Sequence, residues 1–276
     1  GRLVQRISNM AQQILALAWS PDGSQLVAAG GIPGELGEAR VFDPSTGELL
    51  AVAHRAADMV LDVQFDPYGV TFAAGDAENR IALYSPADYS RLRLIDNHAA
   101  WVMALAWSPD GKYLVSASRD KTAKIIEAKN GATISTYGGH YAEVFGVAFA
   151  SDGKQVFSVG RNGKIHVWKA GLADTTGKRF GAEKVAELGG LVRSTPRLRL
   201  AADKLFSIAG KGRVQQHDAV SRQSLGEFGG SGDWVQSLAS EANANRLALG
   251  CHDGRVQVWN TQTGKQIAVF TASPGW

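Results

Sequence analysis

The chain has 276 residues, a formal net charge of +3 and a hydrophobic fraction of 45%, which is ordinary for a globular protein. No apolar stretch approaches the length of about 18 residues that a membrane-spanning helix requires. The sequence has one cysteine, Cys251, which excludes a disulfide framework and a Cys-based metal site within it. Lysine and arginine are dispersed, and the densest basic run, Arg193 to Arg199, is interpreted as a solvated strand edge, so we expect no nucleic-acid partner.

A short turn recurs about every 42 residues along the chain, and a fixed period of this size is typical of repeat architectures. The well-preserved copies are Ser20–Gly23, Asp66–Gly69, Ser108–Gly111 and Ala150–Gly153. Degenerate copies follow at Ala201–Lys204 and Glu241–Ala244.

Short apolar runs flank each turn, as in Val102–Trp107 before one turn and Tyr113–Ser118 after it. A third run follows a tight turn, as in Ile165–Trp168, and a fourth follows a glycine, as in Gln266–Phe270. Runs of five or six residues, rich in Val, Ile, Leu and aromatics, predict strands, because a helix would need roughly 10–12 residues. Their apolar character on both faces predicts sheets that are covered on both sides.

Four strands and their turns account for one repeat, which predicts an all-β protein: a β-propeller of four-stranded antiparallel blades. The predicted blades span residues 14–54, 60–98, 102–140, 144–190, 195–230 and 235–272 of one domain, 1–276. Two copies carry extra residues, at Gly31–Gly37 and Gly171–Glu183, which we expect to form loops on the surface.

The chain ends do not coincide with whole repeats. Residues 1–7 match a fourth strand, and residues 273–276 match the start of a new copy. We therefore expect six nearly complete blades from a longer protein, whose ring has seven or more blades. The alternative is a six-bladed ring in which the N-terminal strand closes the last sheet.

Several residues resemble the signature of the WD-repeat family, whose unit carries Gly-His, an apolar strand, a Ser-Pro-Asp-Gly turn, an Asp in a second turn and Trp-Asp. The resemblance covers essentially the whole chain, although no copy has the full set. It implies a structural hydrogen-bond set in which the matching residues are His98, Asp120, His140, Trp168, Asp253 and Trp259. Copy three has Ile126 in place of the Trp, and copy four has Asn162 in place of the Asp.

The same resemblance implies that the residue before each inner strand lines a partner-binding face. Those residues are Gln13, Met59, Trp101, Glu143, Ser194, Trp234 and Trp276. The turn residues Glu78, Arg119, Arg161, Lys211 and His252 are expected on the same side. Aromatic residues and arginine dominate interface hot spots, which favours this face as a binding site. The alternative is that Trp101 and Trp234 pack between blades as core.

No catalytic constellation is found. His54, His98 and His140 are interpreted as equivalent turn-stabilising residues in successive copies, and none lies beside a suitable nucleophile. A ligand in the central channel would need polar groups on the innermost strands. The residues predicted for those strands are instead small and apolar.

We therefore expect a non-enzymatic scaffold for a protein or peptide partner, with no cofactor and no metal. An insertion at Gly30–Gly34 also resembles propellers of large bacterial proteins, some linked to a c-type cytochrome domain. That resemblance implies an alternative role beside a redox domain outside this sequence, and a cell-envelope location; otherwise the cytoplasm is expected. No haem-attachment motif is present, so haem is not predicted here.

Overall fold

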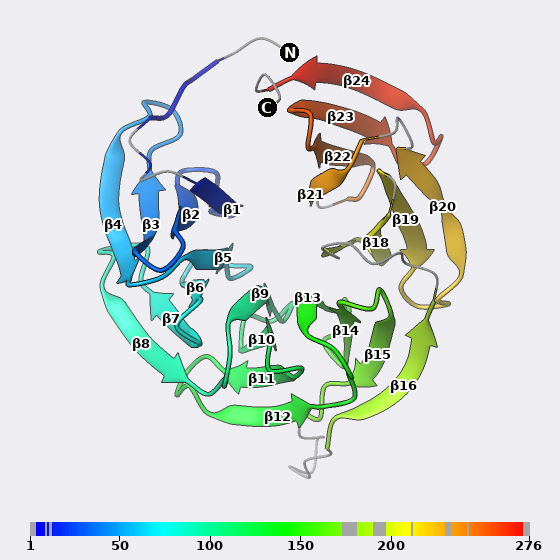
Figure 1. Ribbon diagram of the computed structural model, residues 1–276, viewed down its shortest axis with the longest axis horizontal. Helices are drawn as coiled ribbons and strands as arrows, with labels where there is room; N and C mark the ends of the chain where they lie inside the picture. The colour runs from blue at the N-terminus through cyan, green and yellow to red at the C-terminus, as the bar shows by residue number, and fades with distance from the viewer. Residues whose placement is uncertain are drawn as a thin grey trace.

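The computed structural model describes residues 4–8, 10, 13–172, 181–189, 197–210, 212–229, 233–241 and 243–272. Within these residues the chain forms strands and no helix, and they are grouped into six four-stranded antiparallel sheets. Figure 1 shows the sheets following one another around a common axis as the blades of a propeller. The predicted all-β propeller with six blades of four antiparallel strands is thus confirmed. No helix in the described part of the chain is long and apolar enough to cross a membrane.

Each blade is a simple meander, with strands paired in chain order from the axis outward. Blade 1 contains β1 (Gln13–Trp19), β2 (Leu26–Ile32), β3 (Leu36–Phe42) and β4 (Leu49–Ala56). Blade 2 contains β5 (Val60–Phe65), β6 (Phe72–Asp76), β7 (Arg80–Tyr84) and β8 (Arg91–Asp96). Blade 3 contains β9 (Val102–Trp107), β10 (Tyr113–Ser118), β11 (Ala123–Glu127) and β12 (Thr133–Tyr137).

The second half of the chain repeats this arrangement. Blade 4 contains β13 (Val144–Phe149), β14 (Gln155–Gly160), β15 (Ile165–Lys169) and β16 (Glu183–Leu188). Blade 5 contains β17 (Leu198–Ala201), β18 (Lys204–Ala209), β19 (Arg213–Asp218) and β20 (Ser224–Gly229). Blade 6 contains β21 (Val235–Ser240), β22 (Arg246–Cys251), β23 (Arg255–Asn260) and β24 (Gln266–Thr271).

Turn chemistry fixes where the first strand of a blade ends and the second begins. In blade 3 the Ser108 hydroxyl donates to Asp110 Oδ1 (2.6 Å) and accepts from the Tyr113 backbone N–H (2.9 Å). Gly111 closes the turn with φ 66°, a left-handed conformation that glycine adopts without steric cost. In the degenerate copy of blade 6, Ala244 adopts φ 55° and retains the bond from its N–H to the Glu241 carbonyl (2.9 Å). The repeat therefore keeps its geometry after losing its glycine.

The apolar core lies between blades rather than within them. One buried apolar cluster occupies each junction from blades 1 and 2 to blades 5 and 6. At the junction of blades 3 and 4, for example, Val115 and Ile125 pack with Val144, Val156 and Trp168, all of them fully buried. Because the second strand of a blade has neighbours on both faces, β6 is buried at every residue.

Burial decreases at the periphery of the propeller and at both ends of the blade series. Every residue of β24 is exposed, and β8 is exposed at all positions except Ile95. On β1, Leu17 and Trp19 are more than half exposed (56% and 57%), whereas Val60 and Val63 on β5 are buried. Coverage on both faces therefore holds for second strands such as β6, β10 and β14, and the prediction of two covered faces fails for the outermost strands and for β1.

The first insertion is a hairpin extension and not a loop. Gly31 pairs with Gly37 and Ile32 with Leu36, so β2 and β3 continue to a tight turn. A Cβ on Gly37 would lie 2.0 Å from the Asp58 carbonyl oxygen, and the Gly34 N–H donates to Asp58 Oδ1 (3.0 Å). Glycine is needed here because the segment that links blades 1 and 2 crosses the hairpin at close range. The second insertion lies largely outside the described residues.

The described N-terminal residues do not extend a sheet. Residues 4–8 are in no strand, and Val4 is 92% exposed, because no partner strand pairs with them in the described part of the chain. That residues 1–7 form the last strand of a preceding blade stays a prediction. Residues 273–276 lie outside the described ranges, and the larger ring stays a prediction.

Two tryptophans test the position of the core. Trp168 is fully buried and stacks on Tyr137 with ring centroids 4.9 Å apart, whereas Trp19 is 57% exposed. We expect Trp168→Ala to lower the free energy of unfolding by about 3–5 kcal/mol and Trp19→Ala by no more than about 1 kcal/mol. Urea denaturation of both variants measures the difference. Equal losses would contradict a core that lies between the blades.

Candidate functional site

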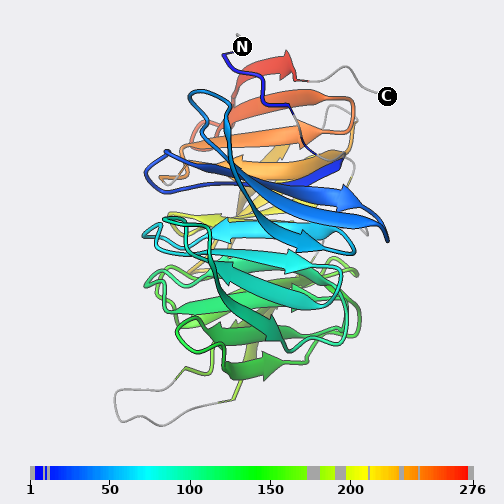
Figure 2. The same ribbon diagram turned by 90° about the vertical axis from the view of Figure 1, so that its left-hand side faces the viewer.

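One rim of the propeller carries the starts of the first strands and the ends of the second strands; we call it the upper rim. Figure 2 shows the hairpin turns of blades 1–3 gathered at two opposite rims, of which this is one. The same backbone bond recurs on it: the Arg119 N–H donates to the Trp101 carbonyl (3.0 Å), and Arg161 donates likewise to Glu143 (2.8 Å). Residues far apart in the sequence are thereby paired on the rim in a fixed geometry.

The corresponding pairs in the other blades follow from this bond. Ala77 donates to Met59 (2.9 Å), His252 donates to Trp234 (2.8 Å), and Gln13 lies opposite Gly31 in the register of β1 and β2. The residue that makes this bond in blade 2 is therefore Ala77, and Glu78 follows it in the same turn, on the expected side. Glu78 bonds the Ala57 N–H (3.1 Å). Ser194, Lys211 and Trp276 lie outside the described residues.

Aromatic and charged side chains interlock on the rim of blades 3 and 4. The Arg119 guanidinium carbon lies 4.4 Å from the centroid of the Trp101 ring, a cation–π contact. Arg161 Nη1 lies 3.3 Å from Glu143 Oε1, and 66% of the Arg161 side chain is exposed. A hydrogen bond from the Glu143 backbone N–H lowers the pKa of the Glu143 carboxyl group. The positive charges of Arg161 and Arg119 lower it further. The carboxylate therefore stays ionised beside two arginines.

The two tryptophans differ in exposure. Trp234 is 51% exposed, and Trp101 is half-buried under the Arg119 guanidinium. Neither is among the buried residues of the clusters between blades. This geometry favours a surface role over the core alternative, without assigning a partner.

A buried polar set lies below the rim in blade 3. His98 Nδ1 bonds Asp120 Oδ2 (2.7 Å) and His98 Nε2 bonds Ser116 Oγ (2.7 Å). Asp120 also accepts from the Thr122 backbone N–H (2.9 Å). Burial alone would raise the pKa of Asp120, but the bonds from His98 and Thr122 outweigh it and lower the pKa. The set in blade 3 has no tryptophan. Ile126, which pairs with Leu114, occupies the position that Trp168, which pairs with Val156, has in blade 4.

Blade 4 has the tryptophan and lacks the carboxylate. The Trp168 indole N–H donates to Ser158 Oγ (3.0 Å), which lies 2.8 Å from His140 Nε2. His140 Nδ1 has no hydrogen-bond partner among the described residues. Asn162 stands where Asp120 stands in blade 3, and its Oδ1 accepts from the Lys164 backbone N–H (3.2 Å) instead of bonding His140. The set is therefore incomplete at one buried ring nitrogen.

Blade 6 keeps the least of the expected set. Asp253 accepts from the Arg255 backbone N–H (3.0 Å) and also pairs with the Arg255 side chain. Trp259 donates its indole N–H to Gln257 Oε1 (3.2 Å), and no histidine of the described residues takes part. The structure thus separates Asp253 from Trp259 instead of joining them through one network.

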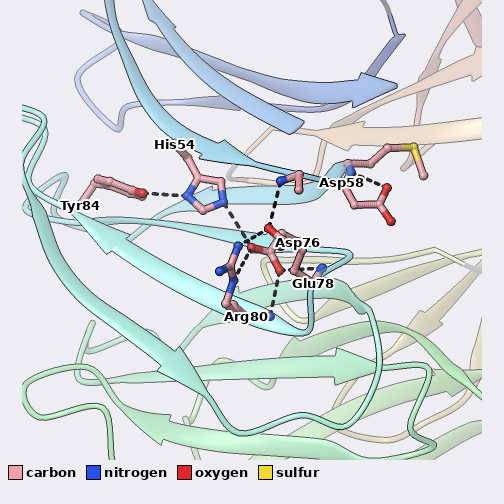
Figure 3. Close-up of polar contacts among 8 residues, drawn as sticks. His54, Asp58, Asp76, Glu78, Arg80 and Tyr84 are labelled. Atoms are coloured by element: carbon pink, nitrogen blue, oxygen red, sulfur yellow. Dashed lines mark hydrogen bonds and ion pairs between the residues drawn. The ribbon is translucent and has the colours of Figure 1, made fainter. Parts of the chain in front are cut away.

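His54 occupies a different position from His98 and His140. It lies within β4, paired with Ala39, six positions before Val60, whereas His98 and His140 precede Val102 and Val144 by four. The expected equivalence is wrong because β4 continues to Ala56 and so contains His54, whereas His98 and His140 lie after the ends of β8 and β12. Figure 3 shows His54 reaching from β4 into blade 2, where Nδ1 bonds the Tyr84 hydroxyl (2.7 Å) and Nε2 approaches Asp76 Oδ2 (3.3 Å).

Asp76 is the centre of this blade 1–blade 2 network. It is fully buried and accepts from the backbone N–H groups of Glu78 (3.0 Å) and Arg80 (2.9 Å). Burial alone would raise its pKa, but the bonds from His54 and Arg80 outweigh that effect and lower it. Both carboxylate oxygens are therefore used for structure, and the group is not poised as a general base.

Sequence reasoning missed Asp62, an acidic residue within the apolar run of β5. It is buried, and its Oδ2 accepts from the Leu105 backbone N–H of blade 3 (2.7 Å). Its Oδ1 accepts from the Val63 N–H (2.9 Å). Burial raises the pKa of Asp62, against the opposing charge of Arg197. The sequence shows Asp62 as a single carboxylate inside an otherwise apolar inner strand. Its hydrogen bonds in the structure show that it joins two blades.

One cluster in the described part of the chain has metal-ligating atoms within 4.8 Å of one another: Asp233, Cys251 and Asp253. The carboxylates are already engaged, since Asp233 Oδ2 accepts from the Asp253 N–H (2.7 Å) and Asp253 pairs with Arg255. Burial and the two carboxylates raise the pKa of the Cys251 thiol, which disfavours the thiolate that binds metals. The hydrogen bond between Asp233 and Asp253 and the ion pair of Asp253 with Arg255 therefore account for the proximity of these residues.

Comparison with known proteins identifies repeats in three segments. Residues 89–127, 131–169 and 222–260 match the family model described as "WD domain, G-beta repeat". The first two matches begin at or just before the outer strand of one blade and end with the third strand of the next. These three segments are therefore similar to WD repeats, and each of them links two blades.

The relatives are matched over short parts of their length. WD repeat-containing protein 1 of Mus musculus is 33% identical over 27% of this chain and 13% of its own length. Actin-interacting protein 1 of Drosophila melanogaster is 25% identical over 47% of this chain and 21% of its own. Apoptotic protease-activating factor 1 of Mus musculus is 29% identical over 41% of this chain and 9% of its own. The bacterial-type, multidomain resemblance finds no support in these comparisons.

The incomplete set in blade 4 predicts a stabilising substitution. In Asn162→Asp a carboxylate oxygen would accept from His140 Nδ1, as Asp120 accepts from His98. We expect a gain of about 1 kcal/mol in the free energy of unfolding at pH 7.5. The matched control, Asp120→Asn in blade 3, should lose about 1–3 kcal/mol. If Asn162→Asp leaves stability unchanged, the orphan donor is not what limits blade 4.

Histidine burial predicts acid sensitivity. Burial, with the charges of His166 and Lys184, lowers the pKa of His140 to about 3, and burial also lowers the pKa of His166 and His217. The folded chain thus binds fewer protons than the unfolded chain, so stability is complete above about pH 6.5 and falls as the pH decreases.

Between pH 7.5 and pH 5 the loss from His140 alone should be about 2 kcal/mol, before the aspartates titrate. Urea denaturation across this range, in the chain and in His140→Gln, measures the share of this residue. An identical pH dependence in the variant would contradict a buried neutral His140.

Proposed function

We propose that the chain is a non-catalytic scaffold that binds a protein or peptide partner on its upper rim. The observation that carries the proposal is the exposed aromatic and arginine surface of blades 3, 4 and 6, which is held by backbone bonds from paired strands. Tryptophan and arginine are the residue types in which binding energy is most often concentrated. The names of two relatives describe actin and a protease, which supports a protein as the class of partner.

The polar residues below the rim support a structural role for the propeller body. The oxygens of Asp62, Asp76 and Asp120 accept backbone or histidine protons. Their hydrogen bonds run between strands or blades, which fixes the rim rather than preparing a nucleophile or a base. A rigid platform binds with little loss of conformational entropy, which favours affinity.

A library of random peptides tests this proposal for partners of any sequence. Peptides displayed on phage are selected on the immobilised chain, and affinities of the enriched peptides are measured for Trp101→Ala and Trp234→Ala. We expect at least one of the two variants to weaken binding tenfold or more, as for hot-spot residues. Leu92→Ala is the control, because Leu92 is 50% exposed on the outer strand β8, away from the rim.

The fold of each variant must be measured beside its binding. A loss of about 3–5 kcal/mol in stability for Trp101→Ala would mean that the side chain is core, and would contradict the surface role. Enriched peptides that bind both tryptophan variants and Leu92→Ala equally would place recognition elsewhere.

A further inference from the structure

Charge is distributed unequally around the described upper rim. Blades 1 and 2 present Asp58 and Glu78 near the segment that links them, and the Glu78 carboxylate pairs with Arg80. Blades 3 and 4 present the cations Arg119, Lys121, Arg161 and Lys164 at their second turns. Blades 3 and 4 therefore form a basic side of the rim, on which the contact between Arg119 and Trp101 lies, whereas Arg55 and Arg80 accompany the acidic groups of blades 1 and 2.

The cations differ in how far they are neutralised. Lys164 pairs with Glu187 (2.7 Å), and Arg161 pairs with Glu143. In the described part of the chain, neither Arg119 nor Lys121 forms an ion pair. Asp120 lies between these two in sequence, but its carboxylate is 9% exposed and bonds His98, so it does not neutralise them at the surface. Among the described residues, two exposed cations thus remain unpaired on one turn.

The stacking of Arg119 leaves its hydrogen-bond donors available. A guanidinium that lies over an aromatic ring directs its N–H groups outward in its own plane, where a carboxylate can accept two of them. The Arg119 guanidinium carbon lies 4.4 Å from the centroid of the Trp101 ring, and this contact limits the movement of the side chain. Tyr141, which is 90% exposed, lies in the segment that leads to Glu143 and offers a second aromatic surface. The site combines oriented cations with apolar contact area.

We propose that the upper rim of blades 3 and 4 binds an acidic segment of a protein partner that carries an aromatic residue. The partner's carboxylates lie on Arg119 and Arg161, and its aromatic side chain contacts Trp101 and Tyr141. This assignment rests on the proposed function, because it names the chemistry of the partner at the same rim. Glu143 acts as an internal competitor, since it occupies Arg161 until a partner carboxylate replaces it.

Fluorescence anisotropy with synthetic peptides tests the proposal. The probe is a fluorescein-labelled peptide of eight Glu and Asp residues around one Phe, and the comparison peptide has Lys in place of every acidic residue. We expect the acidic peptide to bind and the basic one not to bind. Arg119→Gln should weaken binding about tenfold, as for the loss of a charge-assisted bidentate bond. Glu143→Gln should strengthen it several-fold, because Arg161 becomes free.

Arg91→Gln is the matched control, because it removes the same charge at the start of β8, on the opposite rim. Binding by Arg91→Gln should equal that of the unchanged chain. Raising the salt concentration should weaken binding of the acidic peptide, because exposed charges are screened. A merely structural role of Glu143 predicts no gain in affinity when it is replaced, so the gain is specific to the proposed competition.

Several results would overturn the inference. These are no binding of the acidic peptide at about 1 mM, equal loss in Arg119→Gln and Arg91→Gln, or unchanged affinity in Glu143→Gln. A single-stranded oligonucleotide of equal charge that bound more tightly than the peptide would assign the basic side to nucleic acid instead. If library peptides depend on Trp101 but show no acidic bias, the scaffold function stands and the acidic partner is wrong.

Discussion

Packing between neighbouring sheets is the interaction on which the whole structure depends. A four-stranded sheet with apolar residues on both faces is not stable alone in water, and each blade is stabilised by the next one through a buried cluster at their junction. Second strands such as β6, β10 and β14 are consequently buried, while β24 and β8 remain exposed. Because the blades position one another, the residues at the strand ends lie at fixed places on the rim.

Polar bonds across the junctions replace the hydrogen-bond set that the repeats have partly lost. His54 of blade 1 bonds Tyr84 of blade 2 (2.7 Å), and Tyr137 of blade 3 bonds His166 of blade 4 (2.8 Å). Asp62 bonds the backbone of blade 3 through Leu105 (2.7 Å). A buried donor or acceptor costs free energy unless it is paired, so these bonds specify which blade packs against which. Apolar packing supplies the stability and the polar pairs supply the register.

The repeat period and the turn residues predicted the fold, because both reflect local constraints: short apolar runs form strands, and Gly and Asp form the turns between them. Counting from the turns could not predict the register. Strand β4 is longer than the outer strands of the next two blades and contains His54, and Ala77 rather than Glu78 bonds the Met59 carbonyl. The Asp62 carboxylate was missed because its partner, the Leu105 N–H, is 43 residues away in sequence. The rim positions Trp101, Arg119, Glu143 and Arg161 follow from the repeat, but their pairing required coordinates.

Native-state hydrogen exchange tests most directly whether the blades are sealed by their neighbours. The account predicts that amides of β6, β10 and β14, together with the Leu105 amide held by Asp62, exchange slowest and only through global unfolding. Amides of β24 should exchange through local opening at much lower free energy. Equal protection of β24 and β10, or rapid exchange at Leu105, would show that the sheets are stable one by one and would contradict packing between blades as the basis of the structure.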